Sequence, residues 1–328
     1  MNLSGRGVLT LLFLAAYLLV MVLFVLRQIP LTSDDEFYIY YFSEYREFGD
    51  QLLFELIDEP LFKLYTNLFQ TAVSPELGVR ILIMMTILPH LVVAFRLGSW
   101  RGCAYAAGYF LFVELAPHLS WVQLRQGFAV GMLILLLHLG QGRWRSWGVA
   151  VLGLIHTSFL ALLPCFLLVH LKRFLAYVLL VLLLLGLLAN LDLATQLSFL
   201  LGRRETIYLD VEPTYSMTYA VYSVLLIMYV TVWAHDDRNG DSLLIYHAMC
   251  ALIVPMFFMA TLGAFAERLY FFVRCFELNI IVQSRRPRAA WVATGYFGVN
   301  LLYSVYHSYV NFGTGGGILD RYLQVFTL

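Results

Sequence analysis

Long apolar stretches alternate with short polar connectors along most of this chain. The first stretch runs from Val8 to Leu26, after a short basic start that contains Arg6. Further stretches of this kind lie at 79–95, 103–115, 122–139, 174–191, 218–233, 243–265, 269–282 and 290–306. An α-helix needs roughly 20 apolar residues to cross the hydrocarbon core of a bilayer, and these stretches approach that length. The pattern predicts an all-α polytopic membrane protein with about nine to eleven transmembrane or re-entrant helices.

The amino-acid composition excludes a soluble fold. Hydrophobic residues make up 61% of the 328 residues and charged residues only 13%, far from the proportions of an average soluble domain. The first apolar stretch lacks a small-residue cleavage site, so we expect it to be retained as a helix. The formal net charge is +0, so nothing indicates a nucleic-acid partner.

The placement of charged residues predicts a topology. Short basic connectors lie at 96–101, 142–145, 171–173 and 284–288, with another near Arg238. The positive-inside rule places these connectors in the cytoplasm, together with the N-terminus. The outer face then receives the loop 192–216 and the acidic, tyrosine-rich region 28–76, whose aromatic residues have the spacing of surface or re-entrant helices. We expect one integral membrane domain over residues 1–328.

The apolar run 147–170 conflicts with this topology, because basic connectors flank it on both sides. A single spanning helix cannot place both of its ends in the cytoplasm. A break near His156 would give two short arms, which suits a re-entrant hairpin whose tip lines a polar cavity. The alternative is one ordinary helix with a misplaced basic connector.

Arg125 and Gln126 lie at the predicted outer end of an apolar helix. A charged side chain in that position is costly unless it lines a cavity or has a partner, so the two residues are candidate substrate-binding groups. The alternative is an arginine that extends to the lipid headgroups.

Two further polar residues are candidate proton acceptors. His156 lies within an apolar run, and an imidazole exchanges protons near neutral pH. A histidine bonded inside a helix bundle is the alternative. Glu59 precedes Pro60, so its carboxylate could either cap a helix or activate a sugar hydroxyl.

The other candidates are arginines, carboxylates and tyrosines on the predicted outer face. Guanidinium groups bind phosphate oxygens bidentately, whereas carboxylates and aromatic rings are typical contacts for sugars. Each of these residues could also serve as an ion-pair partner, a solvated loop charge or an interfacial anchor. They are Arg204, Arg268, Arg274, Asp35, Tyr38 and Tyr41. No phosphate-binding loop and no metal-ligand spacing occurs in the sequence, so we expect neither a metal nor another cofactor.

The order of these motifs resembles the EpsG family of Wzy-type polysaccharide (O-antigen-like) polymerases. The resemblance is close from Asp34 to Pro164 and looser as far as Arg268. One departure is Leu61, where many members have glycine. The motifs are Asp35, Tyr38 and Tyr41; Glu59-Pro60-Leu61-Phe62; Leu124-Arg125-Gln126-Gly127-Phe128-Ala129; Gly142-Arg143-Trp144-Arg145; and Ile155-His156-Thr157-Ser158.

The resemblance implies a fold like that of the glycosyltransferases that use polyprenyl-linked donors (GT-C-like). It implies transfer of a growing glycan from undecaprenyl pyrophosphate to a lipid-linked repeat unit, without a metal. The expected location is the bacterial inner membrane, with the active site on the periplasmic face. A flippase and a chain-length regulator are candidate partners, beside membrane lipid and the lipid-linked oligosaccharide donor and acceptor.

The resemblance also implies roles for individual residues. It assigns Arg125 and Arg268 to the pyrophosphate and Glu59 or His156 to the hydroxyl proton. The tyrosine-rich region would contact glycan. The alternatives are a lipid-linked oligosaccharide flippase, an O-antigen-ligase-like enzyme and an acyltransferase; a flippase would be expected to show repeat symmetry between its halves, and none is visible.

Overall fold

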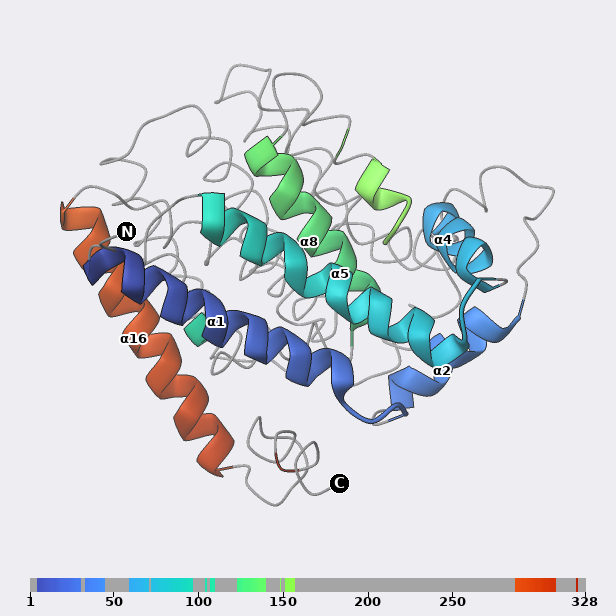
Figure 1. Ribbon diagram of the computed structural model, residues 1–328, viewed down its shortest axis with the longest axis horizontal. Coiled ribbons are helices and arrows are strands. Elements are labelled where there is room, and N and C mark those ends of the chain that lie inside the picture. Colours follow the sequence, from blue (N-terminus) through green and yellow to red (C-terminus); the bar gives the residue numbers. More distant parts are fainter. Residues whose placement is uncertain are drawn as a thin grey trace, which may run out of the picture. The chain divides into compact units, whose positions relative to one another are not determined.

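The computed structural model describes residues 5–30, 33–44, 59–70, 72–96, 104, 107–109, 123–139, 148, 151–156, 287–310 and 323. All regular structure within these ranges is helical, and they contain no strand. The main helices are α1 (Gly5–Leu26), α2 (Ser33–Ser43), α4 (Pro60–Gln70), α5 (Pro75–Arg96), α8 (Leu124–Leu139) and α16 (Pro287–Val310) (Figure 1). The all-α prediction is therefore confirmed for the part of the chain that is described.

The predicted stretches 8–26, 79–95, 122–139 and 290–306 correspond to α1, α5, α8 and α16, with ends shifted by a few residues. The start of α5 shows why the ends shift. Ser74 Oγ accepts a hydrogen bond of 3.3 Å from the backbone N–H of Leu77, and Pro75 occupies the first helical position. A serine cap followed by proline begins the helix four residues before the apolar pattern does.

Several predicted stretches cannot be compared with the structure. Those at 174–191, 218–233, 243–265 and 269–282 lie outside the described residues, as does the loop 192–216. Of the stretch 103–115, only 104 and 107–109 are described, and they are helical. Of the run 147–170, only 148 and 151–156 are described.

The chain divides into two compact units. The first comprises Met1–Glu47, Phe62–Gly140 and Leu278–Leu328, and the second comprises Phe48–Leu61 and Gln141–Glu277. The first unit therefore holds α1, α2, α5, α8, α16 and all of α4 beyond Leu61.

Two of the described helices are long and apolar enough to cross a membrane. They are α1, at Gly5–Leu26, and the Pro75–Val92 part of α5. The outer surface of α1 is covered by leucines, of which Leu12 and Leu19 are each 60% exposed. An exposed apolar surface of this kind suits contact with lipid tails.

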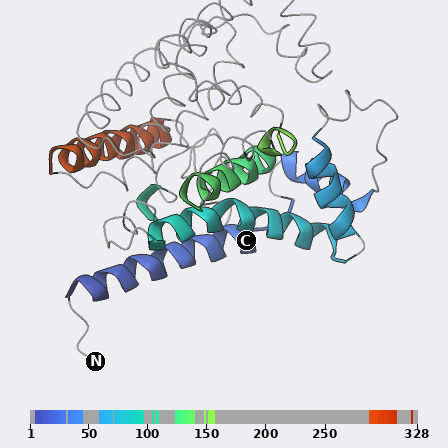
Figure 2. The same ribbon diagram turned by 90° about the horizontal axis from the view of Figure 1, so that it is seen from above.

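Helix α5 lies between α1 and α8 within the first unit (Figure 2). The Tyr17 hydroxyl of α1 donates a buried hydrogen bond of 2.7 Å to the carbonyl of Ile87 in α5. On the other side, a Cβ added at Gly131 of α8 would lie 3.1 Å from the Thr86 carbonyl oxygen and 3.2 Å from that of Met85. The absence of a side chain at Gly131 therefore lets the backbones of α5 and α8 approach closely.

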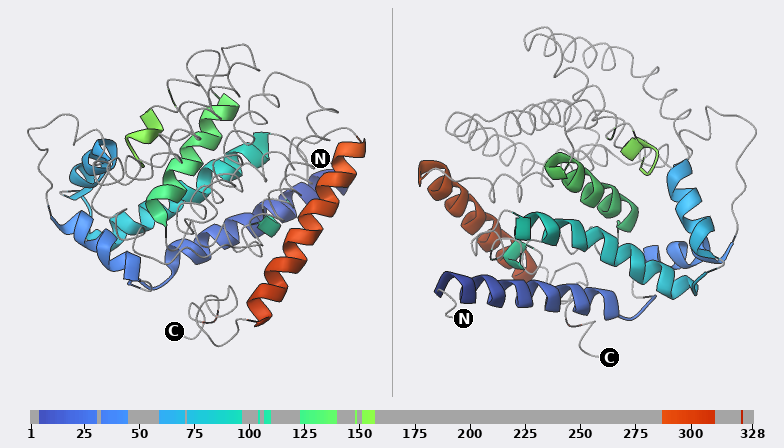
Figure 3. Two further views of the ribbon diagram at one scale, coloured as in Figure 1. Left: turned by 180° about the vertical axis from the view of Figure 1, so that it is seen from behind. Right: turned by 45° about the horizontal axis from the view of Figure 1, so that its top comes forward.

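Helices α2 and α4 both lie near the N-terminal end of α5, and aromatic side chains join them (Figure 3). The buried ring of Phe42 in α2 covers Gly78, where an added Cβ would lie 2.7 Å from a ring atom. The rings of Tyr41 and Phe62 meet edge to face, with 5.7 Å between their centres. The region 28–76 therefore contains two helices, α2 and α4, which contact each other through aromatic side chains.

Helix α16 buries polar residues and exposes apolar ones. Asn300 is 4% exposed and Ser304 is 1% exposed, whereas Trp291 and Leu302 are 78% and 70% exposed. Helices on the surface of soluble proteins have the opposite distribution, with an apolar inner face. The surface that α16 exposes is therefore apolar.

Candidate functional site

Arg125 in the first turn of α8 packs against aromatic rings from two other helices. Its guanidinium carbon lies 5.4 Å from the centre of the Tyr41 ring and 5.6 Å from that of Phe62. The backbone N–H of Arg125 donates a hydrogen bond of 3.2 Å to the hydroxyl oxygen of Tyr38. Cation–π contacts hold a guanidinium in place while it keeps its charge. Three candidates from the sequence, Arg125, Tyr38 and Tyr41, are thus brought together.

The rings around Arg125 continue as an aromatic cluster. Tyr65 of α4 stacks on Phe62 at 6.2 Å and lies 5.6 Å from Phe128 of α8. Burial raises the pKa of Tyr65 and of Tyr38, although the positive charge of Arg125 opposes the shift of the Tyr38 pKa. Both phenols are therefore neutral at physiological pH, and they present hydroxyl groups and ring faces.

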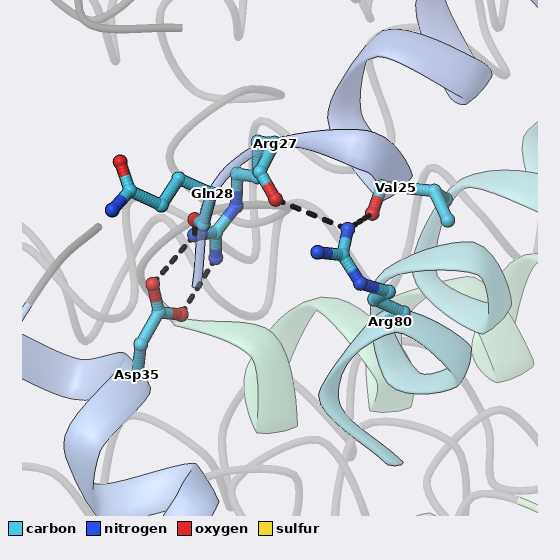
Figure 4. A network of polar contacts seen from close by, with 5 residues as sticks. All are labelled: Val25, Arg27, Gln28, Asp35 and Arg80. Atoms are coloured by element: carbon cyan, nitrogen blue, oxygen red, sulfur yellow. Dashed lines mark hydrogen bonds and ion pairs between the residues drawn. The ribbon is translucent and has the colours of Figure 1, made fainter. Parts of the chain in front are cut away.

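Helix α2, which carries both Tyr38 and Tyr41, is anchored by a buried ion pair. The two guanidinium nitrogens of Arg27 lie 2.5 Å and 2.6 Å from the two carboxylate oxygens of Asp35, and both side chains are 0% exposed (Figure 4). Asp35, Tyr38 and Phe42 are all buried and follow one another at helical spacing. The ion pair therefore fixes the face of α2 from which Tyr38 and Tyr41 reach Arg125.

A second arginine holds the end of α1 on α5. Arg80 Nη1 donates to the carbonyl of Val25 and, at 3.0 Å, to that of Arg27 (Figure 4). These carbonyls lie at the C-terminal end of α1, where the helix has no further amides of its own to satisfy them. Sequence reasoning singled out neither Arg27 nor Arg80. The signal was present for Arg80, because a charged residue lies within an otherwise apolar helix.

Gln126 is 3% exposed, and its neighbour Gln123, which precedes the first residue of α8, contributes a buried side-chain oxygen. The Gln126 Nε2 and Gln123 Oε1 atoms lack a hydrogen-bond partner within the described part of the chain. Buried amide groups are normally paired, so these two atoms need an explanation.

Glu59 and His156, which are far apart in the sequence, lie together in the second unit. The carboxylate oxygen Oε1 of Glu59 is 3.8 Å from His156 Nδ1, and both side chains are mostly buried. This distance is longer than a hydrogen bond and short enough for an ion pair when the imidazole is protonated. The structure thus places the two candidate proton acceptors next to each other.

The backbone on both sides holds this pair in place. The N–H of Leu61 donates a hydrogen bond of 3.1 Å to the carbonyl of Leu154, two residues before His156. Glu59 itself has a φ of 56°, in the left-handed region that residues with a Cβ seldom adopt. Strained backbone of this kind is concentrated at functional sites, where the surrounding structure maintains it.

The remaining candidates, Arg204, Arg268 and Arg274, lie outside the described residues. In the described ranges, no group of three or more His, Cys, Asp or Glu side chains could hold a metal ion.

Comparison with known proteins agrees with the motif order in the sequence. The model of the EpsG family matches residues 10–319, which is nearly the whole chain and extends beyond the motifs in both directions. Searches of curated proteins and of solved structures returned no match. The family match and the two apolar helices identify a membrane protein. The chain therefore belongs to the EpsG family, whose members are Wzy-like polysaccharide polymerases.

Proposed function

We propose that this protein is a polymerase that transfers a growing glycan from undecaprenyl pyrophosphate to a lipid-linked repeat unit. The observation that carries the proposal is the Glu59–His156 pair, at 3.8 Å, with Glu59 in a strained backbone conformation. Family membership supplies the reaction type, and this pair supplies the base that the reaction needs.

In the proposed step, an acceptor hydroxyl oxygen attacks the anomeric carbon of the donor glycan. The hydroxyl proton passes to His156, and the bond between the anomeric carbon and the pyrophosphate oxygen breaks. Its electron pair leaves with undecaprenyl pyrophosphate. The Glu59 carboxylate is next to Nδ1, which makes it suitable for orienting the ring and stabilising the imidazolium that forms when Nε2 takes the proton.

We propose that Arg125 stabilises the negative charge of the departing pyrophosphate. Its guanidinium lies against two neighbouring aromatic rings and stays charged at any working pH. A fixed cation needs little reorganisation as charge develops on the leaving group. Arg268, Arg274 and Arg204 would add further positive charge, and the reaction would proceed without a metal. Tyr38 and Tyr41 would contact glycan, whereas Asp35 would act by holding α2.

We further propose a polytopic, GT-C-like arrangement in the bacterial inner membrane. The N-terminus would be cytoplasmic and the active site would face the periplasm. Support comes from α1, whose exposed surface is apolar, and from α16, which buries Asn300 and Ser304 beneath exposed aromatic and aliphatic residues. A flippase would supply the lipid-linked repeat unit, and a chain-length regulator would set the product length.

The decisive experiment is polymerisation by the purified protein in nanodiscs. The substrate is a synthetic undecaprenyl-pyrophosphate repeat unit without added nucleotide, and the readout is a ladder of glycan lengths. His156→Gln should reduce the rate by roughly 10²- to 10⁴-fold, because a positioned base contributes about that much. Glu59→Gln should reduce it by a similar factor, because the base then loses the carboxylate that orients it. Glu76→Gln is the matched control, since Glu76 is an exposed carboxylate in the first turn of α5.

The form of the product separates the alternatives. A ladder that disappears in both site variants and persists in the control supports the polymerase. A single addition without a ladder indicates ligase-like transfer. Substrate that stays intact in nanodiscs but crosses the bilayer when the protein is placed in sealed vesicles indicates a flippase.

A further inference from the structure

Two buried amide atoms at the start of α8 carry an inference that deepens the proposed function and rests on it. Gln123 accepts the first backbone bond of the helix through its carbonyl, at 2.8 Å from the N–H of Gly127. Gln126 lies three residues further on, a spacing at which positions on a helix share one face. The two side chains therefore start from the same side of the first turn, and they do not bond each other.

The unpaired atoms of these side chains are complementary. Gln123 Oε1 is an acceptor and Gln126 Nε2 is a donor, and neither has a partner among the described residues. Gln126 is only 3% exposed, so bulk water does not satisfy its amide. Folded proteins seldom bury such groups unpaired, because the lost hydration is not recovered. A ligand that both donates and accepts would complete the arrangement.

One free donor and one free acceptor match only one of the three parts of a lipid-linked glycan. A polyprenyl tail forms no hydrogen bonds. A pyrophosphate oxygen accepts hydrogen bonds but cannot donate one to Gln123 Oε1. A sugar hydroxyl or acetamido group does both and is neutral, as the two amides are. Arg125, between the two glutamines in the sequence, is directed to the rings of Tyr41 and Phe62.

We propose that Gln123 and Gln126 form a saccharide subsite, in which Gln126 Nε2 donates to a hydroxyl or acetamido group of the glycan and Gln123 Oε1 accepts from it. With Arg125 assigned to pyrophosphate, the first turn of α8 would bind both the pyrophosphate and the sugar attached to it. Sugar selectivity would depend on these two amides.

The test measures the dissociation constant of the full-length protein in nanodiscs for defined probes. The probes are polyprenyl-pyrophosphate-linked glucose, galactose and N-acetylglucosamine, their deoxy counterparts, and sugar-free polyprenyl pyrophosphate. Gln123→Met and Gln126→Met remove one hydrogen bond each at nearly constant volume. Gln28→Met is the matched control, because Gln28 is exposed.

We expect each site variant to weaken binding of at least one sugar-bearing probe by roughly 3- to 10-fold, the value of one neutral hydrogen bond. Removal of the contacted sugar hydroxyl should weaken binding to the unmodified protein by a similar factor. A glutamine variant tested with that deoxy probe should lose no more than either change does alone. An acetamido contact would appear as a loss confined to N-acetylglucosamine. Sugar-free polyprenyl pyrophosphate should bind all variants equally, which also verifies folding.

Three results would overturn the proposal. The first is that the variants bind every sugar probe as the unmodified protein does. The second is that neither loss of a hydroxyl nor loss of the acetamido group changes binding to the unmodified protein. The third is that no sugar probe binds. Binding and polymerisation together distinguish failure of the subsite from failure of the proposed polymerase. Hydroxyl-dependent binding without a glycan ladder would refute the polymerase and retain the subsite. A glycan ladder that the glutamine variants leave unchanged would support the polymerase and refute the subsite.

Discussion

Removal of the Asp35 carboxylate is expected to destabilise the junction of α1, α2 and α5. Arg27 is 1% exposed and donates to both oxygens of Asp35, at 2.5 Å and 2.6 Å. Asp35→Asn keeps the shape of the side chain but leaves the guanidinium buried without its counter-charge. Asp35→Ala additionally removes the side chain that joins the start of α2 to the end of α1.

The expected magnitude follows from the desolvation of the two ions. Breaking a buried pair by removal of one partner costs about 3–5 kcal/mol, because the remaining charge has lost its hydration. Replacement of both partners by apolar residues is often neutral or stabilising. The double variant Arg27→Met/Asp35→Leu should therefore unfold with a free energy within about 1 kcal/mol of the unmodified protein, or above it.

The assay is equilibrium unfolding in mixed micelles, applied to Arg27→Met, to Asp35→Leu and to the double variant. A double-mutant cycle then gives the coupling free energy of the pair, which should be about 5 kcal/mol or more, because each single loss is at least about 3 kcal/mol and the double variant loses at most about 1 kcal/mol. Glu44→Gln, a change at an exposed carboxylate that follows α2, is the matched control. Single variants within about 0.5 kcal/mol of the control would refute the reasoning.

Three further predictions concern packing, cation binding and metal dependence. Gly131→Ala should cost about 1–3 kcal/mol of unfolding free energy, because its Cβ would lie 3.1 Å from the Thr86 carbonyl oxygen. Gly295→Ala is the control and should be harmless, since nothing lies within 4 Å of that position. Equal stability of the two variants would contradict the close approach of α5 and α8. Tyr41→Leu should weaken the hold on Arg125 by about 0.5–2 kcal/mol and lower kcat more than it raises KM, because Arg125 acts on charge that develops on the leaving group. Tyr41→Phe keeps the ring, so identical kinetics of the two variants would show that the ring is dispensable. Treatment with a chelator should leave the polymerisation rate unchanged. A rate that falls with the chelator and returns on addition of Mg²⁺ or Mn²⁺ would show that arginines alone do not stabilise the charge of the leaving pyrophosphate.

Within the described part of the chain, local patterns predicted where four helices lie but not where those helices begin and end. The apolar stretches 8–26, 79–95, 122–139 and 290–306 all contain the expected helices. Helix α5, for example, begins at the capping residues Ser74 and Pro75 and not where the apolar pattern begins. Caps depend on single side chains and not on periodicity, so a hydrophobic pattern does not locate them.

The sequence by itself determined the membrane class, the family and the positions of the four apolar helices that can be compared, because composition, motif order and periodicity are all encoded along the chain. Only the tertiary structure decided which candidates meet. It placed Glu59 beside His156, and it brought Tyr41 and Phe62 to Arg125. It also showed that Asp35, an expected sugar contact, is fully buried against Arg27. Such pairings depend on the rotation and close packing of helices, which helical periodicity leaves open when residues are distant in sequence.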